Sequence, residues 1–187
     1  MLRIIGGKFK SRLIKTPKST ETRPTSSLVR KAFFDICRNE VEDCRFLDLY
    51  AGSGAMGIEA LSRGARAVTF VESNKQAIRC IKENLELLGL DQQSTLIMKE
   101  AILALKMLER AKSLFDLIYI DPPYQQSALS ILKFLDDHSM IASGGSIFLE
   151  EKSPSKLKIE KELFTRLKWA RERKFGMTIL NEWFINN

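Results

Sequence analysis

A glycine-rich turn flanked by two acids is the part of the sequence best suited to binding a ligand. Asp48 lies in an apolar run that breaks at Gly52 and Gly54, and helix-favouring residues follow from Ala55. This pattern predicts a strand, a tight loop and a helix, in which the glycines take positive φ and the helix start offers unpaired amide groups. Glu72 ends the next apolar run about 20 residues on, a separation suited to a ribose contact. The turn is therefore predicted to bind a nucleotide-like ligand.

Two classes of ligand fit this turn. The spacing of Gly52, Gly54 and Gly57 matches the G-x-G-x-x-G pattern of dinucleotide-binding proteins. The Asp48 carboxylate would oppose a pyrophosphate, whereas it suits a ligand that carries an ammonium and a sulfonium group. We therefore favour S-adenosylmethionine over a dinucleotide. A glycine turn that serves chain geometry alone is the remaining alternative.

A second set of polar groups follows the apolar run 117–120. Asp121 precedes Pro122, Pro123 and Tyr124, and consecutive prolines hold the backbone extended without an amide to donate. The segment is expected to present a carboxylate, the Pro122 carbonyl oxygen and an aromatic ring. Two acceptors can hold the hydrogens of an exocyclic nucleobase amine and orient its lone pair toward a methyl donor, while a ring stacks on the base. The alternative is a plain Pro-Pro turn with Tyr124 half-buried.

The elements that would position both motifs alternate along the chain. Helices are expected at 26–39, 55–63, 74–88, 100–111, 127–137 and 154–165, and strands at 45–50, 67–72, 94–99, 114–120 and 145–150. Such alternation predicts an α/β fold with a mostly parallel sheet and helices on both faces. Residues 169–184 predict an antiparallel hairpin around Gly176, and residues 1–20 a small β-hairpin. Helix 26–39 is expected to pack on the main domain through one face, formed by Leu28, Ala32, Phe33 and Ile36.

Ligands of a doubly wound sheet bind outside the carboxyl ends of its strands, where the strand order reverses. Asp48, Glu72 and Glu100 fall at predicted strand ends, and Asp121 does so too. We therefore expect these acids to share one edge of the sheet.

Composition limits the class of protein. The chain has 187 residues, of which 44% are hydrophobic, enough for one domain with a buried core. No stretch approaches the roughly 18 apolar residues of a membrane span, and the N-terminus lacks a signal-peptide pattern, so a cytoplasmic protein is expected. Three separated cysteines and one histidine favour reduced thiols and no metal site.

Basic charge gathers at the N-terminal end. Residues 1–31 hold nine lysines and arginines against Glu21 alone, within a chain of formal net charge +7. A basic end on a near-neutral body is expected where a protein contacts a phosphate backbone. The alternative is a solvated basic segment.

The chain resembles the RsmD type of class I, Rossmann-like methyltransferases, the bacterial 16S ribosomal RNA guanine-N2 methyltransferases. The blocks that carry the resemblance are RIIGGK at 3–8, RPT at 23–25 with VR at 29–30, DLYAGSGA at 48–55 and DPPY at 121–124. The chain departs from the family pattern at Ser27-Leu28, where Asp-Arg is usual, at Lys31 in place of Glu, and at Glu100 in place of Asp. These departures concern RNA docking and the adenine contact more than methyl transfer.

The resemblance implies a seven-stranded sheet, S-adenosylmethionine as cofactor with S-adenosylhomocysteine as product, and no metal. The implied cofactor-binding residues are Asp48, Tyr50, Ala51, Gly52, Ser53, Gly54, Glu72, Glu100 and Ala101. The implied catalytic residues are Asp121, Pro122 and Tyr124, which would hold the guanine amine. The implied RNA contacts are Arg3, Lys8, Lys10, Arg12, Arg23 and Arg30.

The same resemblance implies a basic RNA-contact extension at 1–22 and a methyltransferase domain at 23–187. The substrate would be one guanine of 16S rRNA in the small ribosomal subunit or a late assembly intermediate, and the protein a monomer without membrane contact. Three other functions compete with this one. A DNA adenine-N6 methyltransferase would use the same DPPY segment, a dinucleotide-dependent oxidoreductase would leave Asp48 unexplained, and a non-catalytic RNA-binding assembly factor would retain the fold without turnover.

Overall fold

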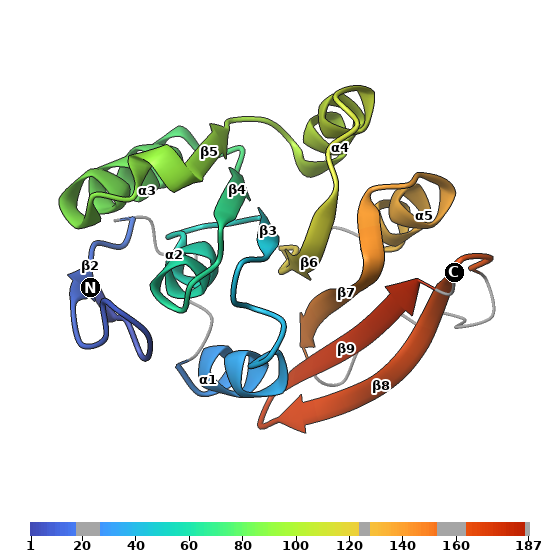
Figure 1. Ribbon diagram of the computed structural model, residues 1–187, viewed down its shortest axis with the longest axis horizontal. Coiled ribbons are helices and arrows are strands. Elements are labelled where there is room, and N and C mark those ends of the chain that lie inside the picture. Colours follow the sequence, from blue (N-terminus) through green and yellow to red (C-terminus); the bar gives the residue numbers. More distant parts are fainter. Residues whose placement is uncertain (18–26, 124–127, 153–163, 186–187) are drawn as a thin grey trace.

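The computed structural model describes residues 1–17, 27–123, 128–152 and 164–185. Its main feature is a seven-stranded sheet with the order β5-β4-β3-β6-β7-β9-β8 (Figure 1). The strands are β3 (Arg45–Leu49), β4 (Ala67–Val71), β5 (Ser94–Ile97), β6 (Phe115–Ile120), β7 (Ile141–Lys152), β8 (Leu167–Phe175) and β9 (Thr178–Ile185). The first five strands in sequence are parallel, and β9 pairs antiparallel with both β7 and β8. The predicted α/β class, seven strands and C-terminal hairpin are confirmed.

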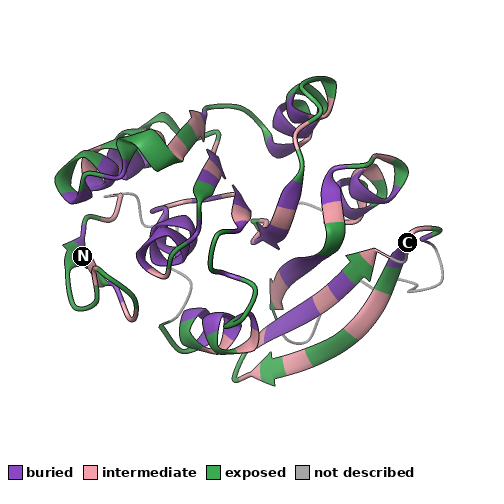
Figure 2. Ribbon diagram, in the orientation of Figure 1, coloured by how far each residue is buried: buried purple, intermediate pink, exposed green. Residues whose placement is uncertain are grey.

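Helices cover both faces of this sheet. They are α1 (Ser27–Ile36), α2 (Ala55–Ser62), α3 (Lys75–Leu88), α4 (Ala101–Arg110) and α5 (Leu129–Asp137), with a short 3₁₀ turn η1 (Asp91–Gln93). Residues of α1, α2 and α3 form one hydrophobic core with the sheet, and residues of α4 and α5 form the other. Figure 1 shows α1 and α2 on the side opposite α4 and α5. Strands β3 and β6 lie between the two cores and are almost entirely buried (Figure 2), which is why their sequences are apolar runs rather than alternating patterns.

The strand order reverses between β3 and β6. From β3 the chain builds outward through β4 to β5, then returns to β6 on the other side of β3 and continues to β7. Leu49 and Ile120 are register partners at the carboxyl ends of the two central strands. The residues that follow them therefore meet at the switch point, where sheets of this kind bind ligands.

A close contact between α2 and the sheet explains the third glycine of the turn. A Cβ on Gly57 would lie 2.2 Å from Cε1 of Phe70 and 2.7 Å from Cγ1 of Val68. Only glycine lets α2 approach β4 this closely, a role known for the third glycine of such motifs.

The N-terminal hairpin is a separate two-stranded sheet, β1 (Leu2–Arg3) and β2 (Leu13–Ile14), as predicted. Its Ile4 and Ile14 side chains are buried in the core that contains α1, α2 and α3. Lys15, the residue after β2, contacts α3: its backbone amide donates to Asn84 Oδ1 at 2.8 Å. The hairpin is thus packed against the body of the molecule.

The structure differs from two expectations about the elements, at β5 and at α1. Strand β5 ends at Ile97, two residues earlier than predicted, because the Lys99 amide turns back to the Ile97 carbonyl oxygen. Leu28 is 59% exposed rather than buried, and α1 instead turns Val29, Arg30, Phe33 and Phe34 inward. The helix expected at 154–165 falls mainly on residues outside the described ranges. Within those ranges, no helix combines the length and apolar character needed to cross a membrane.

Candidate active site

The glycine turn after β3 folds back sharply on the sheet. Tyr50, Gly52 and Gly54 take φ values of 63°, 53° and 75°, a region that glycine enters at low cost and other residues seldom do. The Ala51 amide donates to the Val71 carbonyl oxygen at 3.0 Å. The turn is therefore fixed to the end of β4 as well as β3, and Ala51 and Ser53 are largely buried within it.

The Asp48 side chain hydrogen-bonds to the first turn of α2. Its side chain is 2% exposed, and Oδ2 accepts a hydrogen bond from the Gly57 amide at 2.9 Å, one of the first amides of a helix that lack an intrahelical partner. Burial raises the pKa of Asp48 to about 7, and the charge of Glu72 adds to this rise, although the Gly57 hydrogen bond opposes it. A cation bound nearby would stabilise the ionised form.

Glu72 closes the turn from the side of β4. Its Oε2 accepts from the Gly52 amide at 2.8 Å, and Oε1 accepts from the Asn74 amide at 2.8 Å. The carboxylate thus joins the glycine turn to the start of α3, where Asn74 is the N-cap. This location at the strand end is the predicted one.

Glu100 and Ala101 lie at the start of α4 rather than at the end of a strand, because β5 stops at Ile97. Glu100 is the N-cap residue and Ala101 is buried in the first turn. Burial raises the pKa of the Tyr50 hydroxyl, and the Glu100 charge raises it further. Glu100 therefore interacts electrostatically with the hydroxyl of Tyr50, a residue of the glycine turn.

Asp121 follows directly on β6, beside the glycine turn. Its amide donates to the Leu49 carbonyl oxygen at 3.4 Å, and Asp121 and Pro122 are both partly exposed. The expected meeting of the two motifs at one edge of the sheet is confirmed. Tyr124 lies outside the described residues.

Two residues at this edge were missed by the sequence reasoning. Tyr119 is fully buried and its hydroxyl donates a hydrogen bond to Oε2 of Glu150, at the end of the apolar part of β7. Burial raises the pKa of Tyr119 well above its usual value, and the charges of Glu150, Asp121 and Asp48 raise it further. The Glu150 carboxylate is therefore bonded to the phenol, and the carboxylates of Asp121 and Asp48 act on it through their charge. An acid that closes a buried strand was the signal that identified Glu72, and Glu150 ends the predicted strand 145–150 in the same way.

Burial also raises the pKa of Glu150, while the hydrogen bond from Tyr119 lowers it. Clusters of buried titratable groups are costly for folding and concentrate at functional sites. The pair of Tyr119 and Glu150 is thus a further part of the candidate site.

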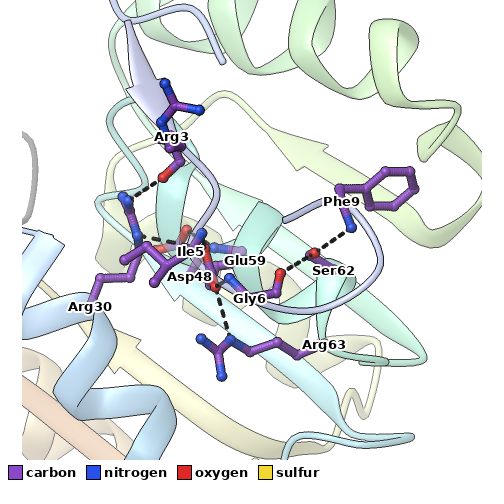
Figure 3. Close-up of polar contacts among 10 residues, drawn as sticks. Arg3, Ile5, Gly6, Phe9, Arg30, Asp48, Glu59, Ser62 and Arg63 are labelled. Atoms are coloured by element: carbon purple, nitrogen blue, oxygen red, sulfur yellow. Dashed lines mark hydrogen bonds and ion pairs between the residues drawn. The ribbon is translucent and has the colours of Figure 1, made fainter. Parts of the chain in front are cut away.

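Arg30 does not lie where an RNA contact requires it. Its side chain is 2% exposed, Nη2 donates to the Arg3 carbonyl oxygen at 2.7 Å, and Nε lies 3.7 Å from Oε2 of Glu59 (Figure 3). The expectation that Arg30 binds RNA is therefore corrected, because its guanidinium is enclosed between α1, α2 and the hairpin. Arg3, Lys8, Lys10 and Arg12 are exposed on the hairpin as expected, whereas Arg23 lies outside the described residues.

Glu59 is the centre of the contacts that hold the hairpin to α2. Its carboxylate accepts from the amides of Ile5 at 2.8 Å and Gly6 at 2.7 Å, and from Nε of Arg63 at 2.9 Å (Figure 3). The hairpin is therefore joined to the same helix whose first turn follows the glycine loop.

Comparison with known proteins identifies the family of this chain. The model of the family described as conserved hypothetical protein 95 matches residues 2–183. The chain belongs to this RsmD-type family. This match, together with the methyltransferase names of the relatives described below, confirms the resemblance found in the sequence, and the chain is a methyltransferase.

Individual family relatives span nearly the whole chain. YlbH of Bacillus subtilis, named as an rRNA methyltransferase, is 34% identical over 178 residues, which cover 95% of both chains. Ribosomal RNA small subunit methyltransferase D of Escherichia coli is 30% identical over 150 residues, covering 80% of this chain and 74% of the relative. The structure of Escherichia coli yhhF, described as a methyltransferase, superposes with a TM-score of 0.82 at 25% identity, covering 97% of this chain and 96% of that one.

Proposed function

We propose that this protein transfers a methyl group from S-adenosylmethionine to the exocyclic N2 amine of a guanine in the 16S rRNA of the small ribosomal subunit. The observation that carries the proposal is the juxtaposition of the glycine turn and the Asp121-Pro122 segment, joined by the hydrogen bond from the Asp121 amide to Leu49. A methyltransferase needs its donor and acceptor sites side by side, and the switch point supplies that arrangement. The names of the relatives, rRNA methyltransferase and small subunit methyltransferase D, support the class of substrate.

The residues at the glycine turn fit the proposed cofactor. When bound, it supplies a methyl group that is already activated by a sulfonium. Asp48 is a buried carboxylate with a pKa of about 7, and a neighbouring cation offsets the cost of ionising such a group. Positive φ at Gly52 and Gly54 lets the backbone approach a ligand closely, and we assign the ribose hydroxyls to Glu72 and the adenine to Glu100.

Asp121 and the Pro122 carbonyl oxygen would act on the substrate amine. The lone pair of an exocyclic amine is delocalised into the base, so the amine is a poor nucleophile. Two acceptors that hold its hydrogens orient the lone pair for in-line attack. Transfer leaves the nitrogen cationic, and the Asp121 carboxylate can accept the proton that it then loses. Tyr124 would stack on a base that is splayed from its neighbours.

The exposed basic residues of the hairpin would contact the ribosomal RNA. Arg3, Lys8, Lys10 and Arg12 project from residues 1–22, the segment that we assign as the RNA-contact extension of a methyltransferase domain at 23–187. A hollow is lined by Gly7 of the hairpin together with Phe34, Arg38, Val41 and Arg63 of the body, and two of these residues are arginines. Arginine and lysine clusters of this kind bind phosphate backbones. A ribosomal substrate would place the reaction in the cytoplasm.

Transfer of labelled methyl groups tests the proposal directly. Purified protein is incubated with labelled S-adenosylmethionine and small ribosomal subunits that lack the modification, with free 16S rRNA and duplex DNA in parallel, and the labelled base is identified after nuclease digestion. We expect N2-methylguanosine from the particle. Label in N6-methyladenine from DNA, or no label despite bound cofactor, would contradict the proposal.

A further inference from the structure

The Asp121-Pro122 segment does not explain how one base would be selected. Guanine, adenine and cytosine all carry an exocyclic amine that two acceptors could hold. Guanine differs because the ring nitrogen beside its amine, N1, carries a hydrogen, whereas the corresponding nitrogens of adenine and cytosine are acceptors. A site that selects guanine therefore needs another acceptor next to the amine-holding groups.

Glu150 occupies the position that such an acceptor requires. Strands β6 and β7 are parallel, and Ile120 and Leu149 are the last register partners before the two acids. Asp121 and Glu150 are the residues that come next on these adjacent strands. Residues in register on neighbouring strands lie on the same face of a sheet, so the two carboxylates emerge side by side at the carboxyl edge.

One carboxylate oxygen of Glu150 is held in place by Tyr119. Tyr119 donates its hydroxyl hydrogen to Oε2, and the Tyr119 ring is itself fixed by edge-to-face packing on Phe33 at 5.0 Å between ring centroids. Glu150 is partly exposed. Among the described residues, no hydrogen bond to Oε1 is found, so this oxygen is available to a substrate.

We propose that Glu150 selects guanine by accepting a hydrogen bond from its N1–H, while Asp121 and the Pro122 carbonyl oxygen hold the adjacent N2 amine. Tyr119 is then a positioning residue that fixes the Glu150 carboxylate. The inference rests on the proposed function, because it concerns the base that the same site would methylate. A carboxylate also repels the N1 lone pair of adenine, so that one group both attracts guanine and rejects adenine.

The test replaces the target guanine with 2-aminopurine, which keeps the C2 amine but has an acceptor at N1. Small subunits are reconstituted from 16S rRNA that carries guanine or 2-aminopurine at the position labelled in the methyl-transfer experiment. We compare kcat/KM on the two particles for the native protein, Glu150→Gln and Glu151→Gln. Glu151 is the matched control, since it is the next residue of β7 and its carboxylate accepts from Asn181 Nδ2 instead.

The native protein should prefer guanine to 2-aminopurine by about 10- to 100-fold, the usual value of a hydrogen bond to a charged group. Glu150→Gln should lose activity on guanine and gain it on 2-aminopurine, because the amide can donate to N1. The loss of the guanine O6 in 2-aminopurine affects every variant alike, so the change in preference isolates N1. Tyr119→Phe should reduce the preference for guanine partially, and Glu151→Gln should leave it unchanged.

Two results would overturn the inference while leaving the proposed function intact. One is equal activity of the native protein on both particles, a result that needs no folded variant. The other is an equal loss by Glu150→Gln on both particles, with cofactor affinity and thermal stability retained. Absence of N2-methylguanosine in the native reaction would instead reject the proposed function itself.

Discussion

The backbone amide of Asp121 donates to the carbonyl oxygen of Leu49 across the switch point, at 3.4 Å. Asp121 begins the segment that would hold the amine. Leu49 ends β3, the strand that leads into the glycine turn. Main-chain hydrogen bonding between β3 and β6 therefore sets the separation of the two motifs, although about 70 residues divide them in the sequence. Positioning of donor and acceptor is the main work of an enzyme whose methyl group is already activated.

Replacing Asp121 with alanine should separate catalysis from cofactor binding. The variant loses the carboxylate that would hold the amine but keeps the glycine turn, so kcat should fall by about 100-fold or more while cofactor affinity changes little. Methyl-transfer kinetics and calorimetric titration with S-adenosylhomocysteine measure the two quantities. Loss of cofactor binding with normal turnover per bound cofactor would show that Asp121 has a different role.

Asp48 should make stability and cofactor binding depend on pH. Its pKa of about 7 in the folded protein exceeds the ordinary value of 3.8, so the folded state binds the proton more tightly than the unfolded state does. The resulting stabilisation is present below about pH 4 and is lost as pH rises to about 7, by an amount on the order of 4 kcal/mol.

Asp48→Asn removes this titration and should flatten that part of the pH dependence. The free energy of unfolding, measured with urea, should change less between pH 5 and pH 8 in the variant than in the native protein. Cofactor affinity of the native protein should rise over the same range, because the ionised carboxylate attracts a cation, and the variant should lack that rise. Parallel pH profiles for the two proteins would contradict the assignment.

Local patterns predicted the turn well because its requirements are local. An acid, glycines at fixed spacing and an apolar run describe Asp48, Gly52 and Gly54 within a few residues. The alternation of strands and helices then predicted that Asp48 and Asp121 share the carboxyl edge of one parallel sheet, although the strand order itself came from the structure. Contacts between distant segments are what the sequence could not supply. The family resemblance implied that Arg30 contacts RNA, yet Glu59 on α2 and the Arg3 carbonyl oxygen provide partners that permit its burial.

Glu150 illustrates the same limit. Its strand was predicted, and its type and location resembled those of Glu72. Its importance depends on Tyr119, 31 residues earlier in the chain and on the neighbouring strand. A pattern within one segment does not reveal such a pair, because the hydrogen bond exists only once β6 and β7 are in register.

Glu59→Gln should destabilise the whole molecule. The substitution removes the negative charge opposite the buried Arg30, and leaving one partner of a buried ion pair uncompensated typically costs about 3–5 kcal/mol. Chemical denaturation measures the loss. The control is Glu83→Gln, which breaks the exposed pair of Lys15 and Glu83 between hairpin and α3 and should change stability little. Similar losses in both variants would mean that burial at Glu59 has no special importance.

Gly57→Ala should push α2 away from β4. The new methyl group would lie 2.2 Å from Cε1 of Phe70, and overpacking of a core of this kind costs about 1–3 kcal/mol. Because the Gly57 amide also bonds to Asp48, cofactor affinity should fall as well. Gly89→Ala is a useful comparison, since its φ of +67° imposes backbone strain but no atom lies within 4 Å of the added carbon. The stability of Gly89→Ala should fall without a change in cofactor affinity. Cofactor affinity retained in Gly57→Ala would contradict the packing argument.

The exposed hairpin charges should determine how RNA affinity depends on salt. Lys8 and Arg12 each lie over the Phe9 ring, at 5.5 Å and 5.6 Å from its centroid, and Lys10 is exposed on the same hairpin. Replacing all three with glutamine should weaken binding to the small subunit. It should also reduce the slope of log K against log salt by about 2 to 3, because each lost phosphate contact removes about 0.7–0.9 from that slope.

A second triple variant, Lys106→Gln with Arg110→Gln and Lys133→Gln, removes the same charge from exposed sites on α4 and α5. These helices cover the opposite face of the sheet from α2 and the hairpin, so their charges should contribute to long-range attraction but not to the slope. Filter binding between 50 and 200 mM salt, a range over which phosphate contacts alter affinity strongly, compares the two variants at equal net charge. An equal effect of both triples would show that net charge, rather than the hairpin, governs RNA binding.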